Sequence, residues 1–331
     1  MPKVYFSFPD GKEFPIDNVL AGSIPAEYLD QYTFSYYKSA AEDRIWTGKP
    51  STTSLTGCGP RETYLKATTP WVEDLNKFAN MWSGTRRHAT LEDDSPNTEI
   101  LLSGEDVTGI ADLLEERPDG KLWLVDYKLV GSYAMRLFKG IEMVDVQSVD
   151  EWGTPQFYRS GKKKGQAKTH KEPIINPNKA ERKKYIRQLN VYRYMIDAAL
   201  ESRNLPGLEK FYGKKIDALK VFFQLRDGGI KAASMNGLDK NIYLEDIPFV
   251  SDEQVQLFIK TRVEMITPCV NAYLANREET VGEVDMPALV ANAPEVCDYL
   301  DSWEGRKCKE YCAARHWCYK IGDNHWFKET E

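Results

Sequence analysis

The 331-residue sequence has no long hydrophobic run and no net positive charge. No apolar stretch approaches the roughly eighteen residues that span a bilayer, so we expect no membrane segment. The first fourteen residues also lack the continuous apolar segment of a secretion signal. We therefore expect a cytoplasmic protein without a membrane partner. In that reducing compartment we expect its six cysteines to be free thiols, metal ligands or catalytic residues and not disulfides.

The net charge of −6 does not favour nucleic-acid binding on average, but the charge is unevenly distributed. Residues 159–187 hold eleven Lys or Arg against two Glu, a local +9 that leaves −15 for the remainder. Residues 159–171, RSGKKKGQAKTHK, offer almost nothing to bury, and we expect a mobile basic loop over about 131–178. Such a run is usually a solvated face. Near a phosphate-handling site it can instead follow a nucleic-acid backbone, with contacts from Lys162, Lys163, Lys164 and Lys168.

The most informative stretch covers residues 109–128, GIADLLEERPDGKLWLVDYK. Two short apolar runs flank a Pro-Asp-Gly sequence centred on Asp119, a pattern that predicts a β-hairpin. Asp112 and Asp126 lie seven residues on either side of Asp119. The ladder of such a hairpin places their side chains roughly opposite one another.

Directly opposed carboxylates have Cβ atoms about 4.5–5.5 Å apart and repel each other unless a cation offsets their charge. Lys128 shares a strand face with Asp126, whereas Tyr127 points to the other face. Two acids and an amine in one patch suit Mg²⁺, with the lysine orienting water or stabilising a phosphate. An alternating strand also supplies Asp and Lys by chance, so this motif alone is weak.

Two helices carry further candidates. Between residues 71 and 92, apolar residues recur at helical spacing and predict an amphipathic helix. Its far end places Gly84, His88 and Glu92 on one face at steps of four. His88 is a candidate metal ligand, although a lone histidine near a helix end is more often solvated. A later helix over about 179–201 places Gln188 and Tyr192 one turn apart on one face.

The cysteines predict a metal centre. Cys308, Cys312 and Cys318 fall within eleven residues in polar surroundings, which favours metal ligation over packing. A fourth ligand is needed. Cys58, in a Gly-Cys-Gly-Pro break between two short helices, competes for that place with Cys297, and Cys269 is a third alternative. Thiolates suit tetrahedral zinc or an iron-sulfur cluster, and spacing alone does not choose between them.

Taken together and in order, these motifs resemble the RecB-like group of PD-(D/E)XK nucleases, in particular the iron-sulfur exonucleases associated with CRISPR systems and phage recombination. Six motifs carry the resemblance: Gly57–Arg61 with Cys58, Gly84-His88-Glu92, Gly109–Asp112, Asp126–Lys128, Gln188–Tyr192 and the closing cysteine trio. Two features differ from the usual family pattern. The first gap in the trio is three residues instead of two, which keeps Cys297 as an alternative ligand, and Asp126 stands where glutamate is common.

The resemblance implies an α/β fold with a PD-(D/E)XK restriction-endonuclease-like core, a mixed central sheet flanked by helices. It also implies an iron-sulfur subdomain formed by N- and C-terminal segments. We accordingly expect an N-terminal segment of strands and loops over 1–53 and a nuclease core over 54–290. A C-terminal segment over 291–331 closes the cluster with Cys58.

The activity implied by the resemblance is metal-dependent exonuclease cleavage of single-stranded DNA or DNA ends in recombination, repair or CRISPR adaptation. Asp112, Asp126, His88 and the carbonyl of Tyr127 would hold Mg²⁺ or Mn²⁺, Lys128 would position the attacking water, and Gln188 and Tyr192 would contact the strand or brace the metal face. Cys58, Cys308, Cys312 and Cys318 would hold a 4Fe-4S cluster. A helicase, a recombinase or a CRISPR adaptation complex is an expected partner, and relatives include homo-oligomers.

Two other classes of function stay open. One is a nucleic-acid-binding subunit that keeps the fold and an iron-sulfur or zinc centre but does not cut. The other is a zinc-ribbon protein with an unrelated core. Intact Asp112, Asp126 and Lys128 argue against the subunit that does not cut. Metal analysis separates the zinc-ribbon protein, because iron with labile sulfide excludes it and one zinc per chain supports it.

Overall fold

The computed structural model describes residues 3–42, 46–91, 97–227, 231–277, 284–297, 307–308 and 312–322; the side chains of 80, 85–91 and 232 are outside that description. The chain forms two compact units. The first comprises Met1–Leu124, Arg187–Leu219 and Pro248–Glu331, and the second comprises Val125–Ile186 and Lys220–Ile247. The units are therefore interleaved along the chain.

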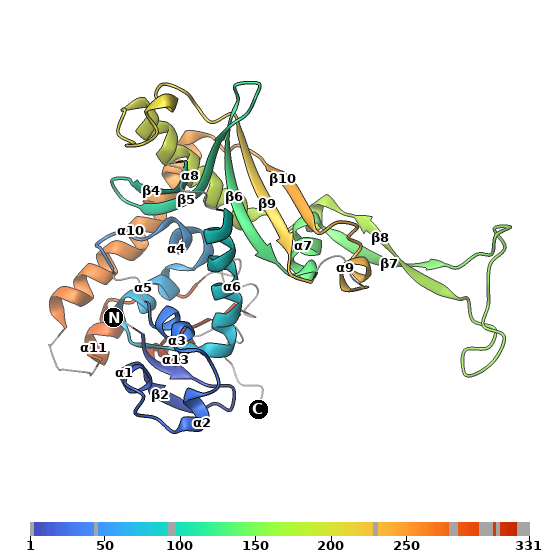
Figure 1. Ribbon diagram of the computed structural model, residues 1–331, viewed down its shortest axis with the longest axis horizontal. Coiled ribbons are helices and arrows are strands. Elements are labelled where there is room, and N and C mark those ends of the chain that lie inside the picture. Colours follow the sequence, from blue (N-terminus) through green and yellow to red (C-terminus); the bar gives the residue numbers. More distant parts are fainter. Residues whose placement is uncertain are drawn as a thin grey trace. The chain divides into compact units, whose positions relative to one another are not determined.

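The chain begins with a small three-stranded sheet of order β2-β1-β3, in which β1 is antiparallel to β2 and parallel to β3. Three helices follow β2 (Figure 1). The bounds of these elements are β1 Lys3–Ser7, β2 Glu13–Pro15, β3 Trp71–Asp74, α1 Ile16–Leu20, α2 Ala26–Leu29 and α3 Phe34–Ala41. The prediction of strands and loops alone over 1–53 is wrong for these helices.

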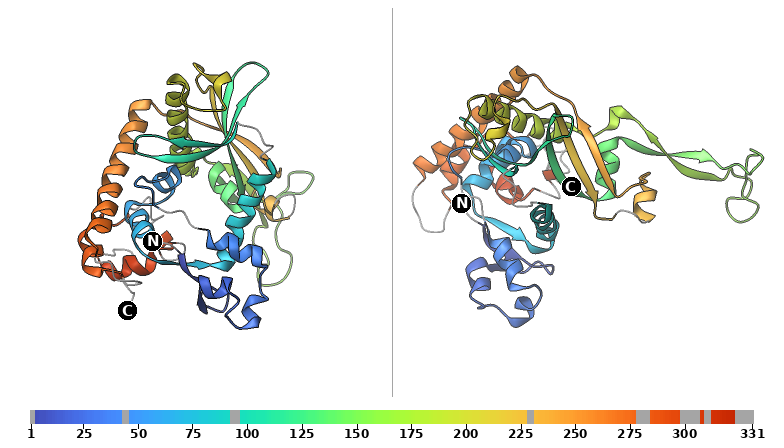
Figure 2. Two further views of the ribbon diagram at one scale, coloured as in Figure 1. Left: turned by 60° about the vertical axis from the view of Figure 1, so that its left-hand side comes forward. Right: turned by 45° about the horizontal axis from the view of Figure 1, so that its top comes forward.

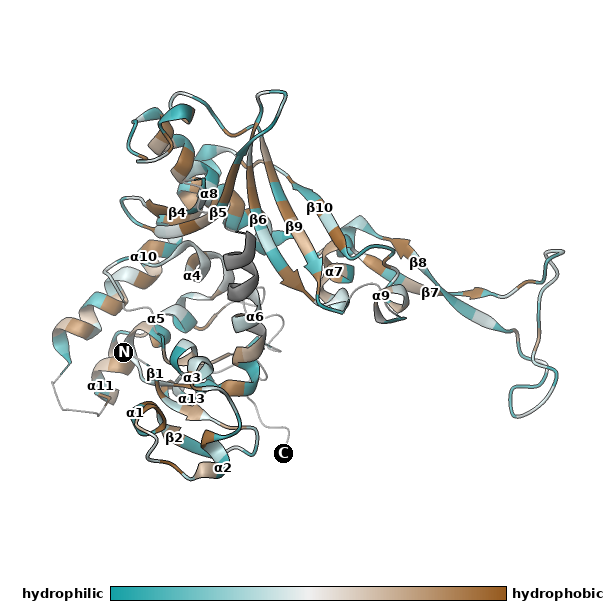
Figure 3. Cartoon of the chain, viewed as in Figure 1, coloured by the Kyte–Doolittle hydropathy of each residue, from teal (hydrophilic) through white to brown (hydrophobic). Residues whose placement is uncertain are grey.

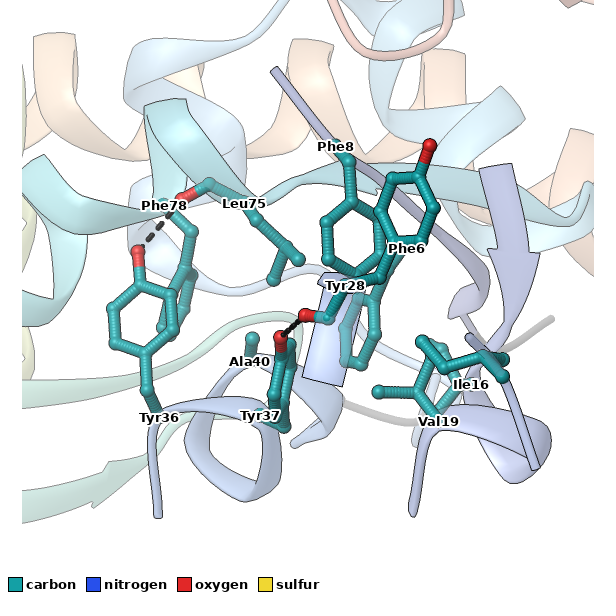
Figure 4. Packing of buried hydrophobic residues seen from close by; sticks show 11 residues of the cluster. Phe6, Phe8, Ile16, Val19, Tyr28, Tyr36, Tyr37, Ala40, Leu75 and Phe78 are labelled. Carbon is teal, nitrogen blue, oxygen red and sulfur yellow. Dashed lines mark hydrogen bonds between the residues drawn. The ribbon is translucent and has the colours of Figure 1, made fainter. Parts of the chain in front are cut away.

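The N-terminal helices form because their apolar residues, aromatic in α2 and α3 and aliphatic in α1, share one core with β1 (Figure 4). The Tyr37 hydroxyl donates to the carbonyl of Tyr28 at 2.5 Å, and the Tyr36 hydroxyl donates to that of Leu75 at 2.6 Å. Each ring is thus buried without leaving its hydroxyl unsatisfied. Aromatic residues so dense in sequence hide the helical period, which explains the wrong prediction.

Two helices flank the Gly-Cys-Gly-Pro break, as predicted: α4 Thr52–Gly57 and α5 Pro60–Thr68. Helix α5 is buried nearly all round and packs against the long helix α10, Asp252–Asn276. The Tyr64 hydroxyl of α5 donates to the carbonyl of Leu289 at 2.9 Å. The segment with Cys58 is therefore held between elements far apart in sequence.

Five strands form the central sheet in the order β10-β9-β6-β5-β4 (Figure 1). Their bounds are β4 Thr98–Ser103, β5 Thr108–Glu116, β6 Leu122–Val130, β9 Ala218–Leu225 and β10 Ile242–Ile247. The predicted hairpin is confirmed: β5 and β6 are neighbours, and the Arg117 amide donates to the carbonyl of Lys121 at 2.8 Å across the turn. The chain is thus a mixed α/β protein whose central mixed sheet is flanked by helices. Its longer helices include α6 Leu75–Leu91 and α8 Lys183–Glu201.

Within the second unit, much of the expected loop over 131–178 is regular structure. It contains α7 Ser132–Lys139, followed by an antiparallel ribbon of β7 Ile141–Gln147 and β8 Thr169–Ile175. The ribbon extends away from α7 and from α9, Lys231–Met235 (Figures 1 and 2). The prediction of a loop is therefore wrong for α7, β7 and β8.

Cross-strand polar pairs explain why this exposed ribbon forms without a buried face. Asp145 lies directly opposite Lys171, with 2.6 Å between Oδ2 and Nζ. Near its base, Glu142 accepts a hydrogen bond from Asn176 at 2.7 Å and pairs with Lys179. Opposite charges across a ladder stabilise a strand pair by roughly 0.2–1 kcal/mol each. These pairs join residues about thirty positions apart and leave no local signal in the sequence.

The C-terminal part of the first unit returns to α5 through α10. It continues with α11 Met286–Ala291 and α13 Arg315–Ile321, and α13 packs against both α5 and α11. Among the described residues, no helix combines the length and the apolar character needed to cross a membrane.

Candidate functional site

Strand β6 carries the predicted acid and lysine side by side. The Asp126 side chain is buried, with 2% of its surface exposed, and Lys128 Nζ lies 2.7 Å from Asp126 Oδ1. The alternation of the strand therefore places both on one face, as predicted. The Tyr127 ring meets the ring of Phe222 on β9 edge-on, with 5.6 Å between centroids.

The second carboxylate oxygen of Asp126 is buried and has no hydrogen-bond partner among the described residues. Leaving a buried acceptor unsatisfied costs about 1–3 kcal/mol, and more when the group is charged. A hard divalent cation offsets that cost, because Mg²⁺ and Mn²⁺ take carboxylate oxygens as ligands. The donor chemistry of Asp126 thus fits the metal implied by the sequence motif.

The other half of the predicted set lies in the first unit. Asp112 on β5 and Gln188 on α8 are half-buried, and Tyr192 on α8 is buried. A Cβ atom at Gly109 would lie 2.6 Å from Tyr192 Cε1 and 2.8 Å from Thr52 Oγ1. Glycine therefore lets the Tyr192 ring lie against β5 three residues before Asp112. The predicted Gly109–Asp112 strand and Gln188–Tyr192 helix are in contact.

The predicted Gly84-His88-Glu92 motif is described only in part. Gly84 lies on α6, and a Cβ atom there would meet nothing within 4 Å. The side chain of His88 and all of Glu92 lie outside the described residues. The role of His88 as a metal ligand stays a prediction.

The candidate cysteine ligands belong to the first unit, and Cys297 lies against the segment that carries Cys58. Cys58 caps the C-terminus of α4, and Gly59 caps the N-terminus of α5. A Cβ atom at Gly59 would lie 2.3 Å from Cys297 Sγ and 2.7 Å from its Cβ. The alternative ligand Cys297 therefore lies against the Gly-Cys-Gly-Pro break itself. Cys269 lies on α10, where its thiol donates to the Met265 carbonyl at 3.4 Å.

Electrostatic interactions link the candidate thiols. Repulsion from ionised Cys318 and Cys308 would raise the pKa of Cys297, and Cys318 acts in the same way on Cys308 and Cys308 on Cys312. Burial raises the pKa of Cys297 and of Cys312 to about 12, and it raises the pKa of Cys58 and of Cys308 above the usual value. Thiols of this kind become ligands by losing a proton, which metal binding promotes.

A buried ion-pair network adjoins Cys58. Glu62 Oε1 lies 2.7 Å from Lys66 Nζ, and Glu62 Oε2 lies 2.5 Å from Lys307 Nζ. Lys66 Nζ is also 3.8 Å from Cys58 Sγ. Burial raises the pKa of Glu62, but the two ammonium groups outweigh burial and hold that pKa below its usual value. Burial and the Glu62 carboxylate raise the pKa of Cys58, and the two ammonium groups offset that rise only in part.

This network was missed in the sequence. Its local signal is the spacing of four between Glu62 and Lys66, which is common on helices. Lys307 joins it from 245 positions away.

Among the described residues, no group of three or more His, Cys, Asp or Glu side chains is arranged to hold a metal ion. The donor set still suits a thiolate-bound centre chemically, because several thiols share one neighbourhood. The iron-sulfur cluster and its ligands Cys58, Cys308, Cys312 and Cys318 remain predictions.

The predicted nucleic-acid contacts lie at the end of the ribbon, between β7 and β8. Lys162, Lys163 and Lys164 are exposed, and Lys168 is half-buried. The ammonium groups of Lys163 and Lys168 lie 5.7 and 6.0 Å from the centre of the Tyr158 ring. Lysines grouped in this way on a surface attract phosphate groups.

A cavity of about 940 Å³ lies in the first unit among β4, α8 and α10. Its charged lining residues are one lysine, Lys260, and four acids: Glu105, Asp106, Glu253 and Glu264. Such a lining repels phosphates, so this cavity is not a candidate nucleic-acid site.

No family model matches the chain, and no curated protein matches it. Among solved structures, the chain is similar to one described as the crystal structure of SSO0001, at 11% identity and a TM-score of 0.31. That similarity covers 75% of this chain and 83% of the other. A likeness this weak supports no statement about function.

Proposed function

We propose that the chain is a metal-dependent DNA exonuclease of the PD-(D/E)XK type that acts on single strands or DNA ends. The observation that carries this proposal is the buried Asp126 carboxylate. One of its oxygens is paired with Lys128, and the other has no hydrogen-bond partner among the described residues. An ordinary structural ion pair has no need of a second, unsatisfied buried oxygen. A catalytic carboxylate does need such an oxygen, because it binds the metal cation that also contacts the phosphate.

Each residue of the proposed active site would have its own role in cleavage. Asp126 and Asp112 would hold the metal, together with His88 and the carbonyl of Tyr127. When bound, Mg²⁺ or Mn²⁺ would supply charge to the phosphate and acidity to a water molecule. Lys128, already fixed by its ion pair, would orient that water or stabilise charge on the phosphate. Gln188 and Tyr192 would brace the β5 side or contact the strand.

The cysteine segment would act as a staple. Cys58 and the trio of Cys308, Cys312 and Cys318 are separated by about 250 residues, so one 4Fe-4S centre would close a large loop of chain. Cys297 is the alternative to Cys58 because it lies against Gly59. A helicase, a recombinase or a CRISPR adaptation complex would supply the DNA. The chain would also assemble with copies of itself into an oligomer.

Degradation of end-labelled linear single-stranded DNA in Mg²⁺ or Mn²⁺ tests this proposal. We expect wild-type protein to degrade the DNA, and EDTA or Lys128→Ala to abolish degradation. Lys121→Ala is the matched control, because Lys121 lies in the turn of the same hairpin with 62% of its side chain exposed. Wild-type protein that leaves the DNA intact with every metal would contradict the proposal.

A second candidate is a subunit that binds nucleic acid through the same fold and cysteine centre without cutting. The lysines at the end of the ribbon favour it, because they offer a phosphate-binding surface that involves neither Asp126 nor Lys128. Binding without degradation in the same assay would select this candidate.

A further inference from the structure

The end of the β7–β8 ribbon is forked. Ser148 donates its amide to the carbonyl of Lys168 at 2.8 Å and accepts from the Gln156 amide at 2.8 Å, while the Lys168 amide donates to the Gln156 carbonyl at 2.9 Å. Two loops leave from this junction, residues 149–155 and residues 157–167. We call them the aromatic loop and the lysine loop.

The aromatic loop presents one tryptophan to solvent. The amides of Trp152 and Thr154 both donate to Asp150 Oδ1, at 3.0 and 2.9 Å, and the Asp150 amide donates to the Thr154 carbonyl at 3.0 Å. These bonds define the turn without using the indole ring, which leaves the Trp152 residue 83% exposed. Tryptophan is enriched at binding interfaces, where its large ring supplies contact area.

The lysine loop is also tied by its backbone. The Tyr158 amide donates to the Gln166 carbonyl at 3.0 Å, and the Gly165 amide donates to the Tyr158 carbonyl at 2.9 Å. Lys162, Lys163 and Lys164 lie between these bonds, and residues 157–168 contain no acid. At its base Phe157 is 50% exposed. Much of the ribbon around it is hydrophilic (Figure 3).

We propose that this fork binds single-stranded DNA, with Lys162–Lys164 on the phosphates and the Trp152 ring stacked on a base. Cations alone would suit any acidic partner. The fork adds a flat, exposed ring to these lysines. Such a ring fits single-stranded DNA, whose bases are free to stack on it, because every base has a π-face. Bases inside a duplex already stack on each other and offer no such face to Trp152.

This inference deepens the proposed nuclease function and rests on it for the identity of the strand as DNA. It adds Trp152 and the fork to the lysines predicted from sequence. One residue of the aromatic loop opposes DNA binding. Glu151 is exposed next to Trp152, and its negative charge repels phosphates.

Fluorescence anisotropy of a labelled single-stranded oligodeoxynucleotide, in EDTA to prevent cleavage, tests the proposal. Trp152→Ala should weaken binding about tenfold, the order of one stacked base, and Trp152→Phe should recover most of it. Tyr133→Ala is the matched control, because Tyr133 is 55% exposed on α7 of the same unit. Glu151→Gln should strengthen binding.

Replacing Lys162, Lys163 and Lys164 together by serine should weaken binding and reduce the slope of log K against log salt by about 2. The control replaces three exposed lysines elsewhere: Lys77, Lys121 and Lys260. The proposal is overturned if single-stranded DNA does not bind, if Trp152→Ala binds like wild type, or if duplex DNA binds equally well with the same sensitivity to Trp152.

The two proposals fail separately. Binding that depends on Trp152 without metal-dependent cleavage overturns the nuclease and leaves the fork standing. Cleavage that depends on Lys128, with binding indifferent to Trp152, does the reverse.

Discussion

Gly59 lies directly against Cys297. A Cβ atom at position 59 would stand 2.3 Å from the Cys297 sulfur, closer than any real contact allows. The segment that carries Cys58 and the segment that carries Cys297 are thus fitted to one another, although 238 positions separate the two residues in contact.

Gly59→Ala should lower the free energy of unfolding by about 1–3 kcal/mol, because the added methyl group must displace the Cys297 side chain and the backbone near it. Urea unfolding measures this loss. Gly57→Ala is the matched control two residues away, where a Cβ atom would meet nothing within 4 Å. Equal loss of stability in both variants would show that the Gly59 contact is unimportant.

Glu62→Gln should destabilise the protein at neutral pH by about 3 kcal/mol, the order found when one partner of a buried ion pair is removed. The Glu62 side chain is 5% exposed and faces both Lys66 and Lys307. The control is Glu264→Gln, since Glu264 forms an exposed pair with Lys260 at 3.9 Å and should matter by less than about 0.5 kcal/mol.

The same network predicts a pH dependence. Lys66 and Lys307 hold the folded-state pKa of Glu62 below its usual value despite burial. A depressed pKa contributes stability above the unfolded-state pKa of about 4.3, and this contribution is lost as pH falls through the folded-state value. Urea unfolding below about pH 4.3 should therefore show a loss of stability that is smaller in Glu62→Gln. An identical acid dependence in both proteins would contradict this account.

If Cys312 is a ligand of the proposed iron-sulfur centre, Cys312→Ala should lose visible colour, iron and labile sulfide and should have a lower melting temperature. Cys269→Ala is the control, because Cys269 lies on α10 with a hydrogen bond of its own to Met265. Comparison of Cys58→Ser with Cys297→Ser shows which thiol is the fourth ligand, because only the variant that lacks this ligand loses its iron. Unchanged iron content and melting temperature in Cys312→Ala would exclude the staple. One zinc per chain in the wild-type protein would show that the centre is a zinc site and not an iron-sulfur cluster.

Local patterns predicted local structure well. The Pro-Asp-Gly sequence around Asp119 predicted the β5–β6 hairpin, and strand alternation placed Asp126 and Lys128 on one face. The Gly-Cys-Gly-Pro break between α4 and α5 was equally visible. In each case the responsible residues are neighbours along the chain, so turn chemistry and periodicity suffice.

Features that depend on distant partners were missed. The β7–β8 ribbon is stabilised by pairs such as Asp145 with Lys171, and the polar composition of each strand alone predicted a loop. The cation Lys307 reaches Glu62 across 245 positions, which no local spacing reveals. The Trp152 turn depends on a short pattern around Asp150, which could have been found, but the surrounding polar composition obscured it.

The proposed nuclease depends above all on a catalytic metal held by Asp126. The most direct test is the rate of nucleotide release from end-labelled single-stranded DNA in Mn²⁺ by wild-type protein and by Asp126→Asn, which keeps the side-chain shape and removes the charge. We expect the variant to lose more than the roughly 10–100-fold that removal of a group supporting a metal ligand costs, while it still binds DNA in EDTA. Equal rates in the two proteins would contradict the account.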